Sequence, residues 1–172
     1  MDSDDRGRFE ERMLPHLGAA YTLARYLLRE PADADDAVQE AYLQAVRRFE
    51  TFRGENARAW LLTIVRRTCY AWADRERRYG SDESQLDDLA APGDEPDVAL
   101  IRDEVRTGVG RAVDRLPLPF REVVVLREIQ ELSYKEIAEV TGVPVGTVMS
   151  RLARARRRLL GTLTAEGIRG DG

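Results

Sequence analysis

LSYKEIAEVTGVPVGTVMSRLARARRRL, residues 132–159, is the stretch that decides the fold we expect for this chain of 172 residues. It predicts two short helices joined by a tight turn. Gly142 lacks a Cβ and can adopt the left-handed conformation that ends the first helix. Pro144 cannot continue that helix, but it is compatible with the start of the next one. The stretch therefore has the form of a helix-turn-helix.

Each of the two expected helices has an apolar side at helical spacing. The first helix presents Leu132, Ile137, Ala138 and Val140, and the second presents Val148, Leu152, Ala155 and Leu159. The second helix is also strongly basic, because the chain between Val140 and Ala165 contains five arginines and no acidic residue. A helix with one apolar face and one dense guanidinium face is suited to lie against phosphates.

The face of the second helix that lies opposite its apolar side indicates how DNA would be read. It carries Gly146, Thr147, Ser150, Arg151, Arg154 and Arg158. The N-terminal members of this set would reach base edges, and the later arginines would reach phosphates. The alternative is a solvated charged helix in an ordinary bundle, since helix-turn-helix shapes also occur without DNA binding.

The charge of the chain is segregated, although its net value of −4 is unusual for a DNA-binding protein. Residues 1–78 balance 14 Arg against 14 acidic residues, and residues 79–100 hold seven acidic residues and no basic one. Residues 101–172 hold 13 Lys and Arg against 10 acidic residues. Because local charge is what a polyanion meets, the last segment remains a candidate for nucleic-acid binding.

Composition argues against several classes of protein. Cys69 and His16 are the only residues of their kinds, so we expect no intrachain disulfide and no His/Cys metal site. We also expect no cofactor and no catalytic residues, since the sequence offers neither a glycine-rich phosphate loop nor a nucleophile–base pair. No apolar run approaches the roughly 20 residues that span a bilayer, and the N-terminus is polar, so we expect a soluble cytoplasmic protein.

Periodicity predicts an all-α chain of two small helical domains joined by a flexible acidic linker. The expected domains are residues 7–78 and 99–163, and the linker is residues 79–98. In the first domain we expect helices over 7–29, 33–49 and 57–78, with Pro31 ending the first and Asp33 capping the second. The second domain is expected to contain helices over 98–115, 119–130, 133–141 and 145–161.

Both halves resemble a bacterial sigma factor of the extracytoplasmic-function group, which keeps the sigma-2 and sigma-4 domains. In the first half, DADDAVQEAYLQAVRRFETF (33–52) and ARAWLLTIVRR (57–67) look like the segments for polymerase binding and promoter opening. In the second half, residues 116–159, from LPLPF to RARRRL, look like the domain that reads the −35 element. The resemblance covers about residues 9–163.

The resemblance places Asp36, Gln39 and Glu40 where the family grips the coiled coil of the polymerase β′ subunit. On a helix, Asp36 and Glu40 lie four residues apart on one face, with Gln39 beside them. This forms a compact acidic patch suited to arginines of a partner. The alternative is that these carboxylates only complement the dipole at the start of the helix.

The resemblance also assigns the loop at about 49–56, with the start of the next helix, to recognition of the −10 element. A positive surface would hold the opened strand there, and the residues that we assign to it are Arg53, Asn56, Arg58, Arg66 and Arg67. Many family members have Asn at the position of Arg67. Since Asn suits adenine and Arg suits guanine or phosphate, the −10 preference stays open. Trp60 is assigned to the core, and Phe52 is left between core and base stacking.

The resemblance, added to the basic helix-turn-helix, implies a dissociable promoter-specificity subunit of core RNA polymerase. Its expected partners are the polymerase β′ coiled coil and β flap, promoter DNA and an anti-sigma factor. The sequence ends soon after the second domain, so we expect control to come from another chain. The rival is a stand-alone helix-turn-helix regulator that binds duplex DNA without polymerase.

Overall fold

The structure, a computed structural model, describes residues 1–79 and 108–165, and every regular element in these two ranges is a helix. The first range contains α1 (Ser3–Met13), the short 3₁₀ turn η1 (Leu14–His16), α2 (Leu17–Leu27), α3 (Pro31–Arg48), the 3₁₀ turn η2 (Phe49–Thr51) and α4 (Ala57–Tyr79). The second contains α6 (Gly108–Asp114), α7 (Leu118–Val124), the π-helical turn η4 (Val125–Ile129), α8 (Tyr134–Thr141) and α9 (Val145–Ala165). We call these two groups of helices the first lobe and the second lobe.

The first lobe is built from α2, α3 and α4, which pack on one another, while α1 and η2 close one end. Apolar residues on the inner sides of its helices are buried, among them Phe9, Met13, Ala24, Val38 and Leu61. Burial of such side chains stabilises each helix by removing apolar surface from water. The predicted helix over 57–78 is confirmed as α4, with its end one residue later.

Two local expectations for the first lobe are wrong. The helix expected over 7–29 is two helices, because Pro15 lies in η1 and has no N–H to continue the α-helical hydrogen bonding. The next helix starts at Pro31, and its N-cap is Glu30 without a side-chain capping bond, so Asp33 does not cap it. Asp33 lies in the first turn instead, where an acidic side chain complements the helix dipole.

The second lobe contains the expected helix-turn-helix in α8 and α9. The side chain of Ser133 accepts a hydrogen bond from the N–H of Glu136, and the Glu136 carboxylate accepts one from the N–H of Ser133, which forms a capping box. Gly142 ends α8 with φ of 73°, and the carbonyl of Pro144 accepts the first hydrogen bonds of α9. Ile137 and Leu152 are buried between the two helices, as predicted.

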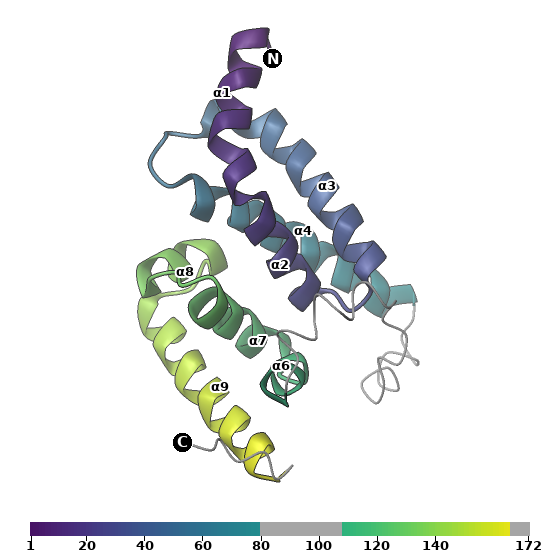
Figure 1. Cartoon of the computed structure of the whole chain (residues 1–172), viewed down its shortest axis with the longest axis vertical. Coiled ribbons are helices and arrows are strands. Elements are labelled where there is room, and N and C mark those ends of the chain that lie inside the picture. The colour runs from purple at the N-terminus through teal and green to yellow at the C-terminus, as the bar shows by residue number, and fades with distance from the viewer. Residues whose placement is uncertain (80–107, 166–172) are drawn as a thin grey trace.

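The two lobes are in contact, whereas the sequence predicts separate modules on a tether. Figure 1 shows α7 and α8 lying beside the first lobe, where α8 packs on α4 and α7 packs on α2. Their buried apolar residues form one continuous cluster. The predicted linker, apart from Tyr79, lies outside the described residues, as does most of the helix expected over 98–115.

Among the helices that the structure describes, none combines the length and the apolar character that crossing a membrane requires.

The turn between α8 and α9 allows a direct test of the fold. Gly142→Ala should lower the free energy of unfolding by about 1 kcal/mol, because a Cβ disfavours the left-handed conformation. Gly161→Ala is the matched control: it lies in α9 with open space around it, so we expect it to raise that free energy by up to about 1 kcal/mol. Urea denaturation of both variants measures the difference, and equal behaviour of the two would contradict this account of the turn.

Candidate nucleic-acid and partner interfaces

The outer face of α9 presents a polar strip to solvent. Gly146, Ser150 and Arg154 are exposed and follow one another at intervals of four residues, so they lie in line along the helix. Thr147 and Arg151 lie beside this strip and are half-buried. The structure thus brings the residues predicted to read DNA onto one surface of one helix.

The remaining residue of that predicted set, Arg158, is partly engaged within the lobe. It is exposed, and its guanidinium lies 4.9 Å from the ring centroid of Phe120, which orients it through a cation–π contact. Sequence reasoning missed two exposed apolar side chains near the start of α9, Val145 and Met149, the second of which is 52% exposed. Both belong to its first two turns, so α9 offers apolar as well as polar contacts near its start.

The acidic face predicted to bind a partner lies on α3. Asp36 and Gln39 are exposed there, one turn apart. Glu40 is half-buried and is held by the first lobe itself: its Oε2 accepts a hydrogen bond of 2.8 Å from Nε1 of Trp72, and its Oε1 lies 3.9 Å from Nη2 of Arg75. Asp36 and Gln39 are thus presented outward, while Glu40 also ties α3 to α4.

An exposed leucine extends this face. Leu43 is 55% exposed and lies four residues after Gln39 and seven after Asp36, which places the three side chains on one side of α3. Partner interfaces commonly combine an apolar centre with a polar rim. The signal was present in the sequence, since Leu43 departs from the apolar spacing of the buried face.

The residues predicted to hold the −10 strand do not form one free surface. Arg53 in the loop before α4 and Arg67 on α4 are exposed. Asn56, Arg58 and Arg66 are half-buried, and all three make contacts with the second lobe. The structure therefore divides the predicted set into two exposed residues and three residues at the junction of the lobes.

Arg66 makes the most buried of these contacts. Its Nε lies 2.7 Å from Oε2 of Glu122 on α7, and its Nη2 lies 3.1 Å from Oε1 of the same carboxylate. The Glu122 side chain is 0% exposed and that of Arg66 is 18% exposed, so this two-point ion pair is shielded from water. The guanidinium also lies 4.3 Å from the ring centroid of Tyr70. Nothing in the sequence marks Glu122 as its partner.

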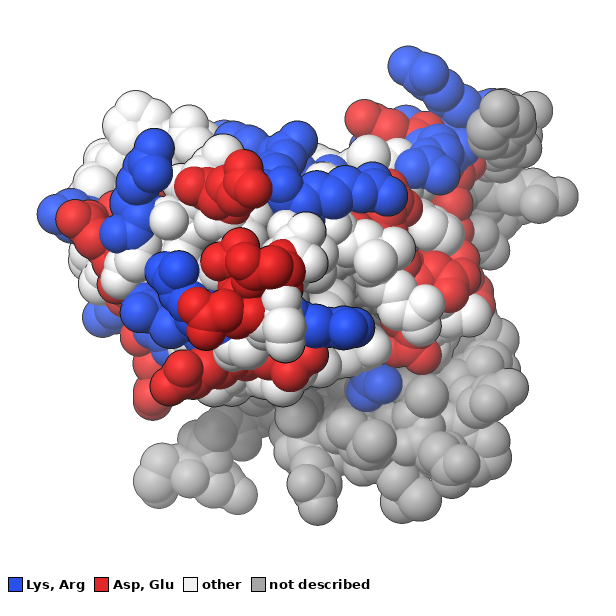
Figure 2. All heavy atoms as spheres, turned by 90° about the horizontal axis from the view of Figure 1, so that it is seen from above, with Lys and Arg blue, Asp and Glu red and all other residues white. Residues whose placement is uncertain are grey.

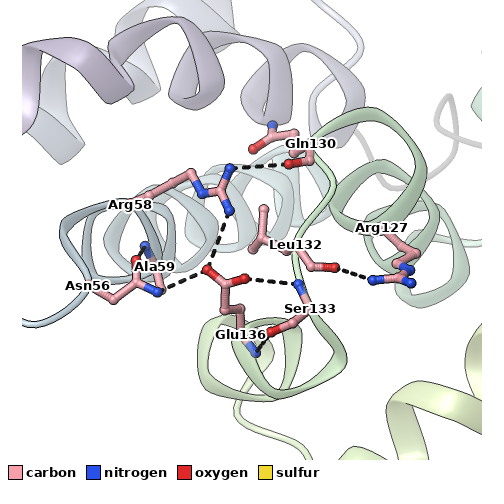
Figure 3. A network of polar contacts seen from close by, with 8 residues as sticks. All are labelled: Asn56, Arg58, Ala59, Arg127, Gln130, Leu132, Ser133 and Glu136. Atoms are coloured by element: carbon pink, nitrogen blue, oxygen red, sulfur yellow. Dashed lines mark hydrogen bonds and ion pairs between the residues drawn. The ribbon is translucent and has the colours of Figure 1, made fainter.

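Glu136 is the centre of the second contact, which Figure 3 shows. Its Oε1 accepts from Ser133 in the capping box, while its Oε2 accepts hydrogen bonds of 2.9 Å from Nδ2 of Asn56 and of 3.4 Å from Nη2 of Arg58. Nη1 of Arg58 donates to the carbonyl of Gln130 at 3.3 Å. One carboxylate thus caps α8 and binds the first lobe.

Asn56 has a structural role that the sequence analysis did not give it. Its Oδ1 accepts a hydrogen bond of 3.0 Å from the N–H of Ala59, so the side chain caps the start of α4. Because its Nδ2 donates to Glu136, both ends of the amide are occupied. The sequence indicates this cap, since Asn directly before a predicted helix is a preferred N-cap residue.

Phe52, which the sequence left undecided, belongs to an aromatic row in the first lobe. Its ring lies 5.9 Å from that of Phe49 and 5.2 Å from that of Trp60, between the centroids. The guanidinium of Arg12 lies 5.3 Å from the same ring. Trp60 packs against the core, as expected. This row fixes the loop before α4 to the body of the lobe.

Charge on one end of the molecule is mixed. Figure 2 looks down on the end at which α1 begins, and acidic and basic residues are interspersed over the face that it shows. A polyanion requires a surface of predominantly positive potential. The face in this view therefore offers no uniformly positive surface for duplex DNA.

Comparison with known proteins finds a family match in each half of the chain. Residues 13–79 match the family profile described as Sigma-70 region 2, and residues 107–159 match the one described as Sigma-70, region 4. The RNA polymerase sigma-H factor of Pseudomonas aeruginosa is 33% identical over 165 residues, which cover 90% of this chain and 86% of that protein. The ECF RNA polymerase sigma-E factor of Escherichia coli K12 is 35% identical over 150 residues, which cover 81% and 78%.

Solved structures resemble this fold across both lobes. The sigma factor RpoE from Bartonella quintana, in complex with the anti-sigma factor NepR, aligns with a TM-score of 0.71 at 27% identity, over 91% of this chain and 97% of that one. CnrH, in complex with the cytosolic domain of CnrY, aligns with a TM-score of 0.66 at 25% identity, over 93% and 90%.

The contact at Glu136 should make the stability of the protein depend on pH. The hydrogen bond from the backbone of Ser133, together with those from Asn56 and Arg58, lowers the pKa of Glu136 from 4.5 to about 2. Its stabilisation is therefore complete above pH 4.5 and is lost as pH falls from 4.5 towards 2. Because the side chain is 23% exposed and partly screened, we expect a loss of roughly 2 kcal/mol.

Urea denaturation between pH 6 and pH 3 measures this loss. Glu136→Gln keeps a capping-box acceptor but cannot titrate, so the difference in unfolding free energy between the wild type and this variant should shrink as pH falls. A difference that stays constant over this range would show that the Glu136 carboxylate has an ordinary pKa.

Proposed function

This chain belongs to the extracytoplasmic-function group of the sigma-70 family, and we infer that it directs promoter-specific initiation of transcription by bacterial core RNA polymerase. The observation that carries this function is the presence of both sigma regions in their family order on one chain. A stand-alone helix-turn-helix regulator would need neither the first lobe nor its similarity to region 2. The chemistry of nucleotide addition belongs to the polymerase, and this chain supplies the choice of promoter.

The second lobe places α9 in the major groove of the −35 element in this proposal. The exposed strip of Gly146, Ser150 and Arg154 supports it, because a small residue at the start of the helix allows close approach to the bases. Thr147 and Arg151 flank the strip and provide further contacts, and Arg158 contacts the phosphates after leaving the Phe120 ring.

The first lobe binds the polymerase through α3. Asp36 and Gln39 are exposed and offer acceptors to the basic side chains of the β′ coiled coil, and Leu43 adds an apolar contact beside them. Glu40 contributes from a position already fixed by Trp72, so its carboxylate meets the partner with little loss of side-chain entropy.

The loop before α4 and the adjacent face of α4 receive the opened −10 strand. Arg53 and Arg67 are exposed and available to phosphates or bases, whereas Asn56, Arg58 and Arg66 must first leave the second lobe. Arg67 favours guanine or phosphate over adenine, and this sets the −10 preference apart from that of relatives with Asn there.

We further propose an anti-sigma factor as regulator. The solved relative RpoE is in complex with the anti-sigma factor NepR, and this chain aligns with RpoE over 91% of its length. Exposed apolar side chains on the second lobe, Val109 and Leu160, are available to such a partner.

Transcription with purified core enzyme tests the function directly. Core polymerase with this chain should start transcripts on the DNA upstream of the chain's own gene, and core polymerase alone should not. A gel shift separates the rival: strong binding of the chain alone to duplex promoter DNA, with no effect on start sites, would favour the stand-alone regulator.

Substitutions in α9 test the −35 assignment. The double variant Arg151→Ala/Arg154→Ala should weaken binding to the −35 element by about 1–3 kcal/mol for each arginine that reads a base. Protection of that element should fall accordingly. Arg156→Ala is the control, since Arg156 pairs with Glu128 at 2.8 Å and lies outside the predicted set. DNase footprints of the polymerase holoenzyme measure the effect, and an unchanged −35 footprint in the double variant would remove these arginines from the interface.

Substitutions in α3 test the docking surface. Asp36→Ala with Gln39→Ala should reduce affinity for core polymerase by at least tenfold, since exposed interface anchors contribute on the order of 1–2 kcal/mol. Glu10→Ala is a control of equal charge change on an exposed part of the first lobe. Affinity measured by fluorescence anisotropy should fall only for the first variant, and equal affinities would place the interface elsewhere.

A further inference from the structure

The second lobe covers the part of the first lobe that we assign to −10 capture. Three of the five residues of that set, Asn56, Arg58 and Arg66, hold carboxylates of the second lobe. The −35 strip on α9 and the polymerase-facing residues Asp36 and Gln39 remain exposed in the same arrangement. Contact between the lobes thus covers part of the proposed −10 surface and leaves the proposed −35 and polymerase-binding surfaces accessible.

The contact with Glu122 uses the groups of Arg66 that DNA would need. A carboxylate and a phosphate both bind a guanidinium through two parallel hydrogen bonds. Nε and Nη2 of Arg66 already make that pair with Glu122, and the ring of Tyr70 covers the guanidinium face. A phosphate can therefore reach this edge of Arg66 only after Glu122 has left.

The contact with Glu136 likewise blocks the access of a DNA base to Asn56 and Arg58. The amide of Asn56 is used at both ends, by the N–H of Ala59 and by Glu136. Only the bond to Glu136 can be given up without opening the start of α4. Arg58 is held by the same carboxylate and by the carbonyl of Gln130. A base edge competes here with the second lobe.

We propose that Glu122 and Glu136 are an intramolecular substitute for promoter DNA, which keeps single-stranded DNA off the first lobe until the lobes separate. The assignment of Asn56, Arg58 and Arg66 to DNA rests on the proposed function, but the contact between the lobes does not. The chemistry is an exchange of carboxylate for phosphate on the same guanidinium groups.

This contact is well suited to be reversible. A buried ion pair contributes little net stability, because desolvation of the two charges offsets most of their attraction, yet it strongly disfavours loss of one partner. When DNA replaces Glu122, Arg66 keeps an anionic partner and Glu122 regains water, so neither charge is left buried alone. The cost of opening the lobes appears in the affinity for DNA. The apparent affinity equals the intrinsic affinity multiplied by the fraction of chains that are open.

Binding of single-stranded DNA to the full-length chain tests the proposal. Glu122→Gln removes the charge that holds Arg66. Glu136→Gln keeps the cap of α8, but it turns an amide N–H₂ towards the donors of Asn56 and Arg58. The probe is a fluorescein-labelled DNA strand of random sequence and about 20 nucleotides. Each variant should bind it about tenfold more tightly than the wild type, since a hydrogen bond to a charged group is worth about one factor of ten or more.

Two controls make the result specific. Glu128→Gln removes an equal charge from the second lobe. Because Glu128 pairs with Arg156 of the same lobe, the affinity of this variant for the DNA strand should rise much less. Arg66→Ala added to Glu122→Gln should abolish the gain, because the gain requires the released guanidinium. Small-angle scattering should show a larger radius of gyration for Glu122→Gln than for the wild type.

The outcomes separate this proposal from the proposed function. Equal gains for Glu122→Gln and Glu128→Gln, or a gain that survives Arg66→Ala, would overturn the proposal by showing a general charge effect. Unchanged affinity together with an enlarged radius of gyration would overturn it as well, since opening would then not expose a DNA site. Neither result bears on whether core polymerase with this chain starts transcripts at new sites, which tests the function separately.

Discussion

The shielded ion pair between Arg66 and Glu122 is the interaction that constrains how the two lobes of this protein can separate. It joins α4 of the first lobe to α7 of the second, and its two charges are nearly removed from water. Such a pair cannot lose one member without leaving a buried charge unpaired. The lobes must therefore remain together, or separate far enough for both groups to be hydrated or rebound.

This constraint connects the fold to the function. A sigma factor contacts polymerase, the −35 duplex and the opened −10 strand, and the three proposed surfaces differ in their accessibility here. The face of α3 and the strip on α9 are exposed, while three of the five residues assigned to the −10 strand contact the second lobe. Separation of the lobes would then be the step that makes the protein competent to hold melted DNA.

Much of the fold could be predicted from the sequence, because its signals are local. Gly142 ends α8 in the left-handed conformation, and the apolar spacing of Ile137, Val148 and Leu152 places the core between the two helices. Pro15 is a local signal that was overlooked. The contact between lobes was not predictable, since Glu122 and Arg66 are 56 residues apart and each looks like an ordinary charged residue on a helix.

The distance between the lobes, followed through the steps of initiation, tests the central claim most directly. Cysteines in place of the exposed Leu14 and Leu160 can carry a donor and an acceptor dye, while the buried Cys69 thiol, whose pKa burial raises to about 12, stays unlabelled. Energy transfer should be high in the free chain and fall when core polymerase and promoter DNA are added. The same transfer efficiency in the free chain and in the open promoter complex would contradict the account.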